Sequence, residues 1–209
     1  ESGAFDVNLA APYLALTNTR YWRQGAGSPT AGAATLSVSA TQNLDLSGSI
    51  NLHGFKTSSF QSGGDIRLIG AASSIDDQNR KGQLASVGDL HFTARQIYPT
   101  TLTEFELRVQ DNPTGVIKFD RSVRTDGSLV ADIPVLSAGG KLIVQAPTIA
   151  QGGVIKAPLG EIVLDTGNGD LELKANSITS VSLENQLVPF GYVENGKLWK
   201  YGFSDAVNR

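Results

Sequence analysis

Three groups of neighbouring acidic and basic residues in the sequence could do chemistry. Carboxylates grouped with Arg or Lys are what polysaccharide-cleaving enzymes use for general acid and base catalysis. The groups are Asp76 and Asp77 with Arg80 and Lys81, Glu104 and Glu106 with Arg108, and Asp120 with Arg121 and Arg124. The first group is typical of a solvated polar loop. The second group occupies alternate positions of a strand, a pattern that the solvent-exposed face of a hairpin also shows. No spacing among them is diagnostic, so we predict no catalytic residue and no enzyme.

Five aromatic residues are candidates for ligand binding, because flat amphipathic rings stack well on sugar rings. They are Tyr21, Trp22, Tyr192, Trp199 and Tyr201. The alternative is that these rings cover the end of an apolar core. Replacing Trp22 and Trp199 separately with Ala distinguishes the two. A loss of glycan binding at an unchanged melting temperature would exclude capping.

The sequence offers few residues for metal or thiol chemistry. It has no cysteine, which excludes disulfides, zinc–thiolate sites and thiol nucleophiles. Its two histidines, His53 and His91, each follow a leucine and are expected to be exposed strand residues rather than a metal pair. No phosphate-binding loop and no Ser–His–Asp order is present. We therefore predict no metal and no cofactor.

Composition narrows the class of protein further. The formal net charge is −3 and no run of Lys or Arg occurs, which argues against nucleic-acid binding. No apolar run approaches the ~20 residues that span a bilayer, so we predict that the chain is not an integral membrane protein. The chain contains no Met and its start does not resemble a signal peptide, which suggests a piece of something longer.

Alternation of apolar and polar residues predicts an all-β fold. Leu36 and Val38 alternate with serines, Leu90 and Phe92 flank His91, and Leu142 and Val144 flank Ile143. In a strand this pattern puts one set of side chains inward and the other outward. Helical periodicity is hard to find, and the segments are separated by Gly, Ser, Asn or Asp.

A ten-residue phrase is repeated along the chain. It begins with glycine, continues with alternating aliphatic residues and an alanine, and ends with isoleucine. The copies are Gly88–Ile97 (GDLHFTARQI), Gly140–Ile149 (GKLIVQAPTI) and Gly169–Ile178 (GDLELKANSI). Gly64–Gly70 (GDIRLIG) and Gly160–Thr166 (GEIVLDT) match its first half, 24 residues before Gly88 and 20 residues after Gly140. Such periods of roughly 20 residues with short strands favour a solenoid, here a parallel β-helix, over an antiparallel sandwich. Leu142, Val144 and Ile149 should then point into one coil, with Ala146 at a corner.

Two segments interrupt the repeat and are predicted to form hairpins outside the coils of the β-helix. Residues 103–121 contain two strands around Asp111-Asn112-Pro113-Thr114-Gly115, and should protrude as a hairpin. Residues 188–203 contain Asn195-Gly196 between alternating residues, which predicts a two-residue turn and a hairpin that caps the core. Residues 1–209 are otherwise predicted to form a single domain.

Several strings resemble the large bacterial exoproteins of the filamentous haemagglutinin type, in a conserved region towards the C-terminal part of some of them. They are NLDLSGSINLHGF (43–55), QIYPTTL (96–102), APTIAQGGVIKAPLG (146–160), APYLAL (11–16) and VPFGYVENGKLWKYG (188–202). The resemblance covers nearly the whole chain. It implies a right-handed parallel β-helix within a long, rod-like protein that is secreted or displayed on the bacterial surface.

The resemblance also implies a role. Proteins of this type are exported through a dedicated outer-membrane secretion partner, and many serve in adhesion or contact-dependent inhibition. We therefore expect a structural shaft segment that holds distal regions away from the cell. The alternatives are a module that binds a glycan or a receptor on host or bacterial cells and, third, a β-helical polysaccharide-cleaving enzyme.

Overall fold

The computed structural model describes residues 5–18, 28–72, 80–183, 192–194 and 198–200, which form strands, turns and irregular segments but no helix. The predicted all-β class is confirmed. The paired strands of this part of the chain run parallel, with two exceptions. These are β7 (Ala71–Ala72) with β8 (Arg80–Ser86), and β19 (Tyr192–Glu194) with β20 (Leu198–Lys200). The predominance of parallel pairing excludes an antiparallel sandwich.

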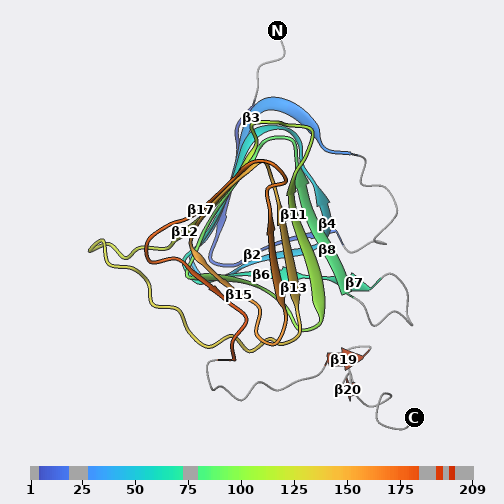
Figure 1. The fold of residues 1–209 in the computed structure, drawn as a ribbon, viewed down its shortest axis with the longest axis vertical. Helices are drawn as coiled ribbons and strands as arrows, with labels where there is room; N and C mark the ends of the chain where they lie inside the picture. Colours follow the sequence, from blue (N-terminus) through green and yellow to red (C-terminus); the bar gives the residue numbers. More distant parts are fainter. Residues whose placement is uncertain (1–4, 19–27, 73–79, 184–191, 195–197, 201–209) are drawn as a thin grey trace.

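Most strands belong to three parallel ladders, each ordered as in the sequence. Ladder A contains β1 (Val7–Ala11), β3 (Thr30–Ala40), β5 (His53–Ser62), β9 (Asp89–Ala94), β12 (Val116–Arg121), β14 (Thr148–Gly152) and β17 (Asp170–Leu173). Ladder B contains β2 (Leu14–Asn18), the first half of β4 (Leu44–Asn51), β6 (Asp65–Ile69), β10 (Gln96–Pro99), β15 (Val154–Lys156) and β18 (Ile178–Ser180). Ladder C contains the second half of β4, β8 (Arg80–Ser86), β11 (Thr103–Val109), β13 (Lys141–Gln145) and β16 (Glu161–Asp165). Figure 1 shows the ladders as the three sides of a triangle.

Inward-facing side chains form columns across the strands, because opposite residues in parallel strands lie only about 4.8 Å apart. Phe60, Phe92 and Phe119 occupy matched positions in ladder A and are fully buried. Their rings stack, with centroids 5.3 Å apart in each successive pair. The apolar core therefore runs continuously from strand to strand along the ladder.

The repeated phrase corresponds to one strand, a corner and the start of the next strand. Leu142 and Val144 of β13 and Ile149 of β14 are fully buried, and Ala146 is buried at the corner between them, as predicted. In the third copy Leu171 and Leu173 are 45% and 62% exposed. They are exposed because β17 is at the edge of ladder A.

The glycine that opens the phrase is required by close packing rather than by a left-handed backbone. A Cβ atom on Gly88 would overlap the carbonyl oxygens of Phe55 and Lys56, and one on Gly160 would overlap the carbonyl oxygen of Gly140. Gly48 is different, since its φ is +76°. It lies where β4 passes from ladder B to ladder C, and its left-handed backbone allows that bend.

The prediction of a protruding hairpin at 103–121 is wrong. β11 pairs in parallel with β8 and β13, and β12 pairs in parallel with β9 and β14, so the two strands belong to different ladders. The turn between them forms a corner. Asn112 donates its Nδ2 to the carbonyl of Val87 at 2.8 Å, which fastens the turn to the preceding strand connection.

The true excursion is the following segment, residues 122–140, which we call the strap. It leaves ladder A after β12 and rejoins at β13 in ladder C, so β10 and β15 pair directly in ladder B, through Ile97 and Ile155 (Figure 1). Within it, Val123 and Leu129 form an antiparallel bridge. The strap passes over the outer face of ladder B.

The C-terminal hairpin is described only as two short strands. β19 (Tyr192–Glu194) and β20 (Leu198–Lys200) pair antiparallel, with Glu194 opposite Leu198. This register leaves three residues between the paired positions, where the sequence suggests a two-residue turn. The proposed cap stays a prediction.

Candidate functional site

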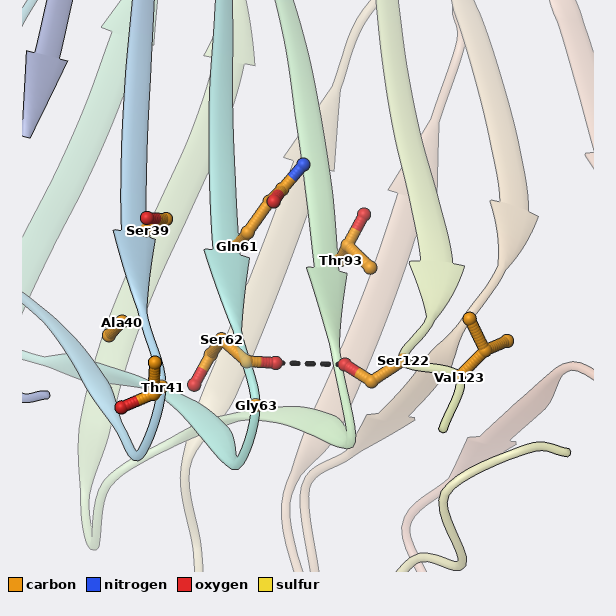
Figure 2. A pocket seen from close by; sticks show the side chains of 9 residues that line it. All are labelled: Ser39, Ala40, Thr41, Gln61, Ser62, Gly63, Thr93, Ser122 and Val123. Carbon is orange, nitrogen blue, oxygen red and sulfur yellow. Dashed lines mark hydrogen bonds between the residues drawn. The ribbon is translucent and has the colours of Figure 1, made fainter. Parts of the chain in front are cut away.

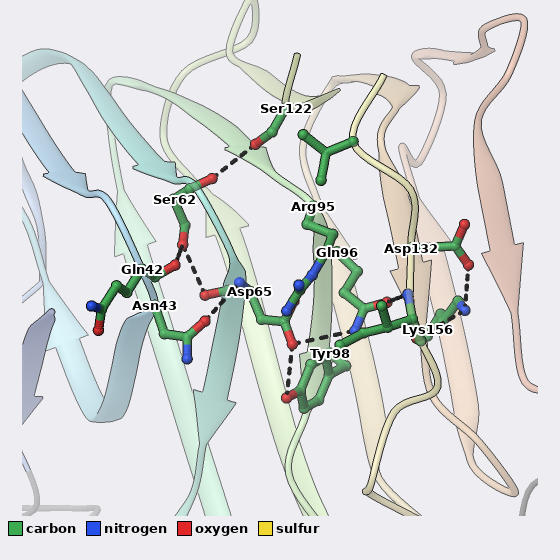
Figure 3. A network of polar contacts seen from close by, with 12 residues as sticks. Gln42, Asn43, Ser62, Asp65, Arg95, Gln96, Tyr98, Ser122, Asp132 and Lys156 are labelled. Carbon is green, nitrogen blue, oxygen red and sulfur yellow. Dashed lines mark hydrogen bonds and ion pairs between the residues drawn. The ribbon is translucent and has the colours of Figure 1, made fainter. Parts of the chain in front are cut away.

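The densest group of buried polar side chains lies on the outer face of ladder B, beneath the strap. Residues on the outer face of a sheet are normally solvated, but here the strap contacts Gln96 and Lys156, and arginine side chains pair with Asp45 and Asp65. Asp45, Asp65, Gln96 and Lys156 are each at most 6% exposed. Figure 3 shows most of this group and its contacts with the strap.

Asp45 of β4 lies opposite Arg67 of β6 and binds it with both carboxylate oxygens. Arg67 donates Nε to Oδ1 at 2.6 Å and Nη2 to Oδ2 at 2.7 Å. The Tyr13 hydroxyl donates a third hydrogen bond to Oδ2 at 2.6 Å. The carboxylate raises the pKa of Arg67 mainly through these hydrogen bonds, so Arg67 stays protonated.

Asp65 of β6 accepts three side-chain hydrogen bonds (Figure 3). The donors are Arg95 Nε at 2.8 Å, Gln96 Nε2 at 3.2 Å and the Tyr98 hydroxyl at 3.3 Å. Burial, and then the negative charge of Asp65, raises the pKa of Tyr98. Tyr98 is therefore a neutral hydroxyl that gives its hydrogen to Asp65.

Lys156 of β15 is 2% exposed and pairs with Asp132 of the strap at 2.6 Å. The hydrogen bond from Lys156 lowers the pKa of Asp132. Two further bonds fasten the strap: Gln96 Oε1 accepts from the backbone N–H of Ile133, and Ser137 donates to the carbonyl of Pro99. The strap is thus held by the ion pairs of Asp132 with Lys156 and, at 3.7 Å, with Arg121, and by hydrogen bonds along its length.

A cavity of about 500 Å³ lies at the carboxyl ends of the strands of ladder A, where the strap begins. Figure 2 shows Ser39, Gln61 and Thr93 on three neighbouring strands, with Ser122 and Val123 of the strap beside them. Ser122 donates to the carbonyl of Ser62 at 2.8 Å. Every residue lining this cavity is uncharged.

A second cavity, of about 340 Å³, lies between the strap and ladder B. Arg67, Tyr98 and Thr101 line its sheet side, and Ile133 and Leu136 line its strap side. It therefore has one polar and one apolar wall.

The arrangement does not provide a pair of free catalytic carboxylates. Asp45 and Asp65 each accept from an arginine, and a general acid would need a protonated, unpaired carboxyl. No group of three or more His, Asp or Glu side chains that could hold a metal ion is found within the described residues. Nor does this part of the chain contain a helix that could span a membrane.

The three predicted charge groups are not assembled into one site. Asp76 and Asp77 lie outside the described residues, and Lys81 pairs with Glu104 at 3.1 Å on the exposed face of ladder C. Glu106 pairs with Arg108 on the same face. In the third group, Asp120 pairs with Lys118 at 2.7 Å rather than with its arginines. Arg121 instead donates to the carbonyl of Val130 in the strap, and Arg124, itself a strap residue, donates to the carbonyl of Leu129.

The five aromatic candidates fall largely outside the described residues. Tyr21, Trp22 and Tyr201 lie outside the described residues, and only the backbone of Tyr192 and Trp199 is described. The histidines are placed as expected: His53 is exposed, and His91 lies on the outer face of ladder A between the buried Leu90 and Phe92.

No motif in the sequence predicts the buried polar group on the outer face of ladder B. Asp45 and Arg67 are 22 positions apart, and Asp132 and Lys156 are 24 apart, in segments with no common motif. Only the register of the ladders brings them together. The available signal was a charged residue, Lys156, inside the apolar run Val154–Ala157.

Comparison with known proteins gives no relative: no protein-family model, curated protein or solved structure matches the chain.

Proposed function

We propose that the chain is a segment of a right-handed parallel β-helix that serves as a structural shaft. The observation that carries this proposal is the cyclic order of the strands. From β9 to β12 the chain passes through ladders A, B, C and A again, and from β13 to β18 it follows the same cycle. A coil that returns to the same ladder one strand further on is the repeating unit of a solenoid.

The geometry suits a stiff spacer. Seven strands stacked in ladder A, at about 4.8 Å per step, extend roughly 29 Å along the axis. Backbone hydrogen bonds between parallel strands lie along that axis, and the phenylalanine stack fills the interior continuously. Length is therefore gained by adding coils, each supported by its neighbour.

The resemblance to filamentous haemagglutinin-type exoproteins supports a location. We infer that the segment belongs to a secreted or surface-exposed bacterial exoprotein that leaves the cell through an outer-membrane secretion partner. The shaft would hold distal adhesive or effector regions away from the cell. We propose no catalytic role, because the buried carboxylates are paired with arginines.

Antibodies raised against the 209-residue chain test this function in the bacterium that encodes it. The expected result is labelling of intact, unpermeabilised cells, with immunogold particles outside the outer membrane. Labelling that requires permeabilisation would overturn the proposal. An antibody against a cytoplasmic protein is the control for cell integrity.

A further inference from the structure

The cavity of about 340 Å³ between the strap and ladder B has walls of opposite character. On the strap side, Ile133 and Leu136 line the cavity. Their side chains are 41% and 72% exposed, so they are available to contact a ligand. On the sheet side the lining is polar. A ligand that fills this space needs one apolar face and one face that makes hydrogen bonds.

The directions of the hydrogen bonds in the polar wall restrict the ligand further. The Tyr98 hydroxyl gives its hydrogen to Asp65, so its oxygen can only accept a hydrogen bond from a ligand. Arg67 uses Nε and Nη2 on Asp45, and its Nη1 has no hydrogen-bond partner among the described residues. The wall thus presents an acceptor and a donor, which a hydroxyl group, being both donor and acceptor, can match.

The charges in this wall disfavour an anion. Arg67 is neutralised by Asp45, and Arg95 by Asp65, which leaves no uncompensated positive charge. A carboxylate or phosphate offers only acceptors, so it would face the Tyr98 oxygen without a hydrogen to share. Arginine usually binds such anions with two parallel hydrogen bonds, and Arg67 already makes both of these bonds to Asp45.

We propose that this cavity binds one ring of a neutral saccharide. The apolar face of the ring lies against Ile133 and Leu136, while its hydroxyl groups donate to Tyr98 Oη and accept from Arg67 Nη1. The volume is at the lower end of the range for small-molecule sites, which suits a single ring or the end of a chain. This proposal is independent of the shaft function, since it depends on the cavity alone.

Saturation-transfer NMR and calorimetry on the 209-residue chain test the site. The probes are the methyl glycosides of glucose, galactose and mannose, N-acetylglucosamine, and glucuronate as the acidic probe, at millimolar concentration. At least one neutral probe should bind, and glucuronate should bind at least about fivefold more weakly, from the loss of one hydrogen bond.

Two variants on the same strap separate specific from nonspecific binding. Leu136→Ser removes the apolar wall and should weaken binding about fivefold to tenfold, whereas Leu129→Ser, which is exposed but lies outside the cavity, should leave it unchanged. Tyr98→Phe keeps the ring, removes the acceptor and should weaken binding by a similar factor, with unfolding curves confirming the fold. The proposal is overturned if no neutral probe binds, if only glucuronate binds, or if Leu129→Ser and Leu136→Ser weaken binding equally.

Discussion

Arg67 and Asp45 face each other from neighbouring parallel strands and share two hydrogen bonds, on a face where Asp45 is only 4% exposed. Arg67→Met should lower the free energy of unfolding by about 2 kcal/mol. Among the described residues, it leaves the buried carboxylate of Asp45 with Tyr13 as its one remaining side-chain donor. Urea denaturation measures the loss. The double variant Asp45→Asn/Arg67→Met should recover part of it.

The matched control for this prediction is an exposed pair of the same kind. Lys81 and Glu104 are also opposite each other in parallel strands, at 3.1 Å, but their side chains are 42% and 43% exposed. Lys81→Met should change stability by less than about 0.5 kcal/mol, since solvent screens the pair. Equal effects of the two substitutions would show that the burial of Asp45 does not strengthen the Arg67–Asp45 pair.

Asp132 should make the stability of the strap depend on pH. Its pKa in the folded protein is lowered by the hydrogen bond from Lys156, so its contribution is complete above the unfolded value of about 3.9. That contribution is lost as the pH falls through the folded-state pKa. Asp132→Asn should cost about 1 kcal/mol at pH 7, because the carboxylate is partly open to solvent.

The difference between wild type and Asp132→Asn should therefore shrink on acidification. Melting temperatures of both proteins between pH 7 and pH 2 measure it. A difference that stays constant over this range would contradict the account of Asp132 as an ionised partner of Lys156.

At two glycines, Ala and Asn substitutions should rank in opposite order: Ala should be the better substitute at Gly88, and Asn at Gly127. Gly88→Ala should destabilise by about 1–3 kcal/mol, and Gly88→Asn by more, since any side chain meets the backbone of Phe55 and Lys56. Gly127 has φ of +80° and open space around it, so Gly127→Ala should cost about 1 kcal/mol and Gly127→Asn less. Thermal unfolding of the four variants gives the order. If Asn is the better substitute at Gly88 too, close packing is not the reason for the repeated glycine.

Ser58 should be replaceable with a gain in stability. It is fully buried between Leu36 and Leu90 in an inward column, and its hydroxyl has no hydrogen-bond partner among the described residues. Ser58→Ala removes an unsatisfied polar group and should stabilise the protein by about 0.5–1 kcal/mol. The neighbouring, outward-facing Ser59→Ala should change it by less than about 0.5 kcal/mol. A loss of stability in Ser58→Ala would mean that its hydroxyl makes a favourable interaction.

The period-2 alternation predicted well which residues are inward, because the strand itself sets that pattern. His91 between Leu90 and Phe92 is one example, and Leu142 and Val144 are another. The segment 103–121 was mispredicted because Asp-Asn-Pro-Thr-Gly favours a turn without specifying its angle. A corner between two ladders and a reversal into a hairpin use the same residue types.

The candidate site could not be predicted, because its contacts join residues from strands far apart in the sequence. Asp65 meets Arg95, 30 positions later, only through the register of the ladders and their corners. The strap carries no strong periodicity, and nothing local indicates that it lies over Lys156. Long-range register is set by the whole stack, which a local pattern does not encode.

Because the chain has no cysteine, pairs of introduced cysteines test directly whether neighbouring strands are parallel and in register. Ser37 lies opposite Ser59, and Ser39 opposite Gln61, in β3 and β5. Opposite residues are within disulfide reach, whereas the diagonal pairs, roughly 7–8 Å apart, are not. Under mild oxidation, the variants S37C/S59C and S39C/Q61C should both cross-link, and S37C/Q61C and S39C/S59C should not. Preferential cross-linking of the diagonal pairs would indicate antiparallel strands and contradict the account.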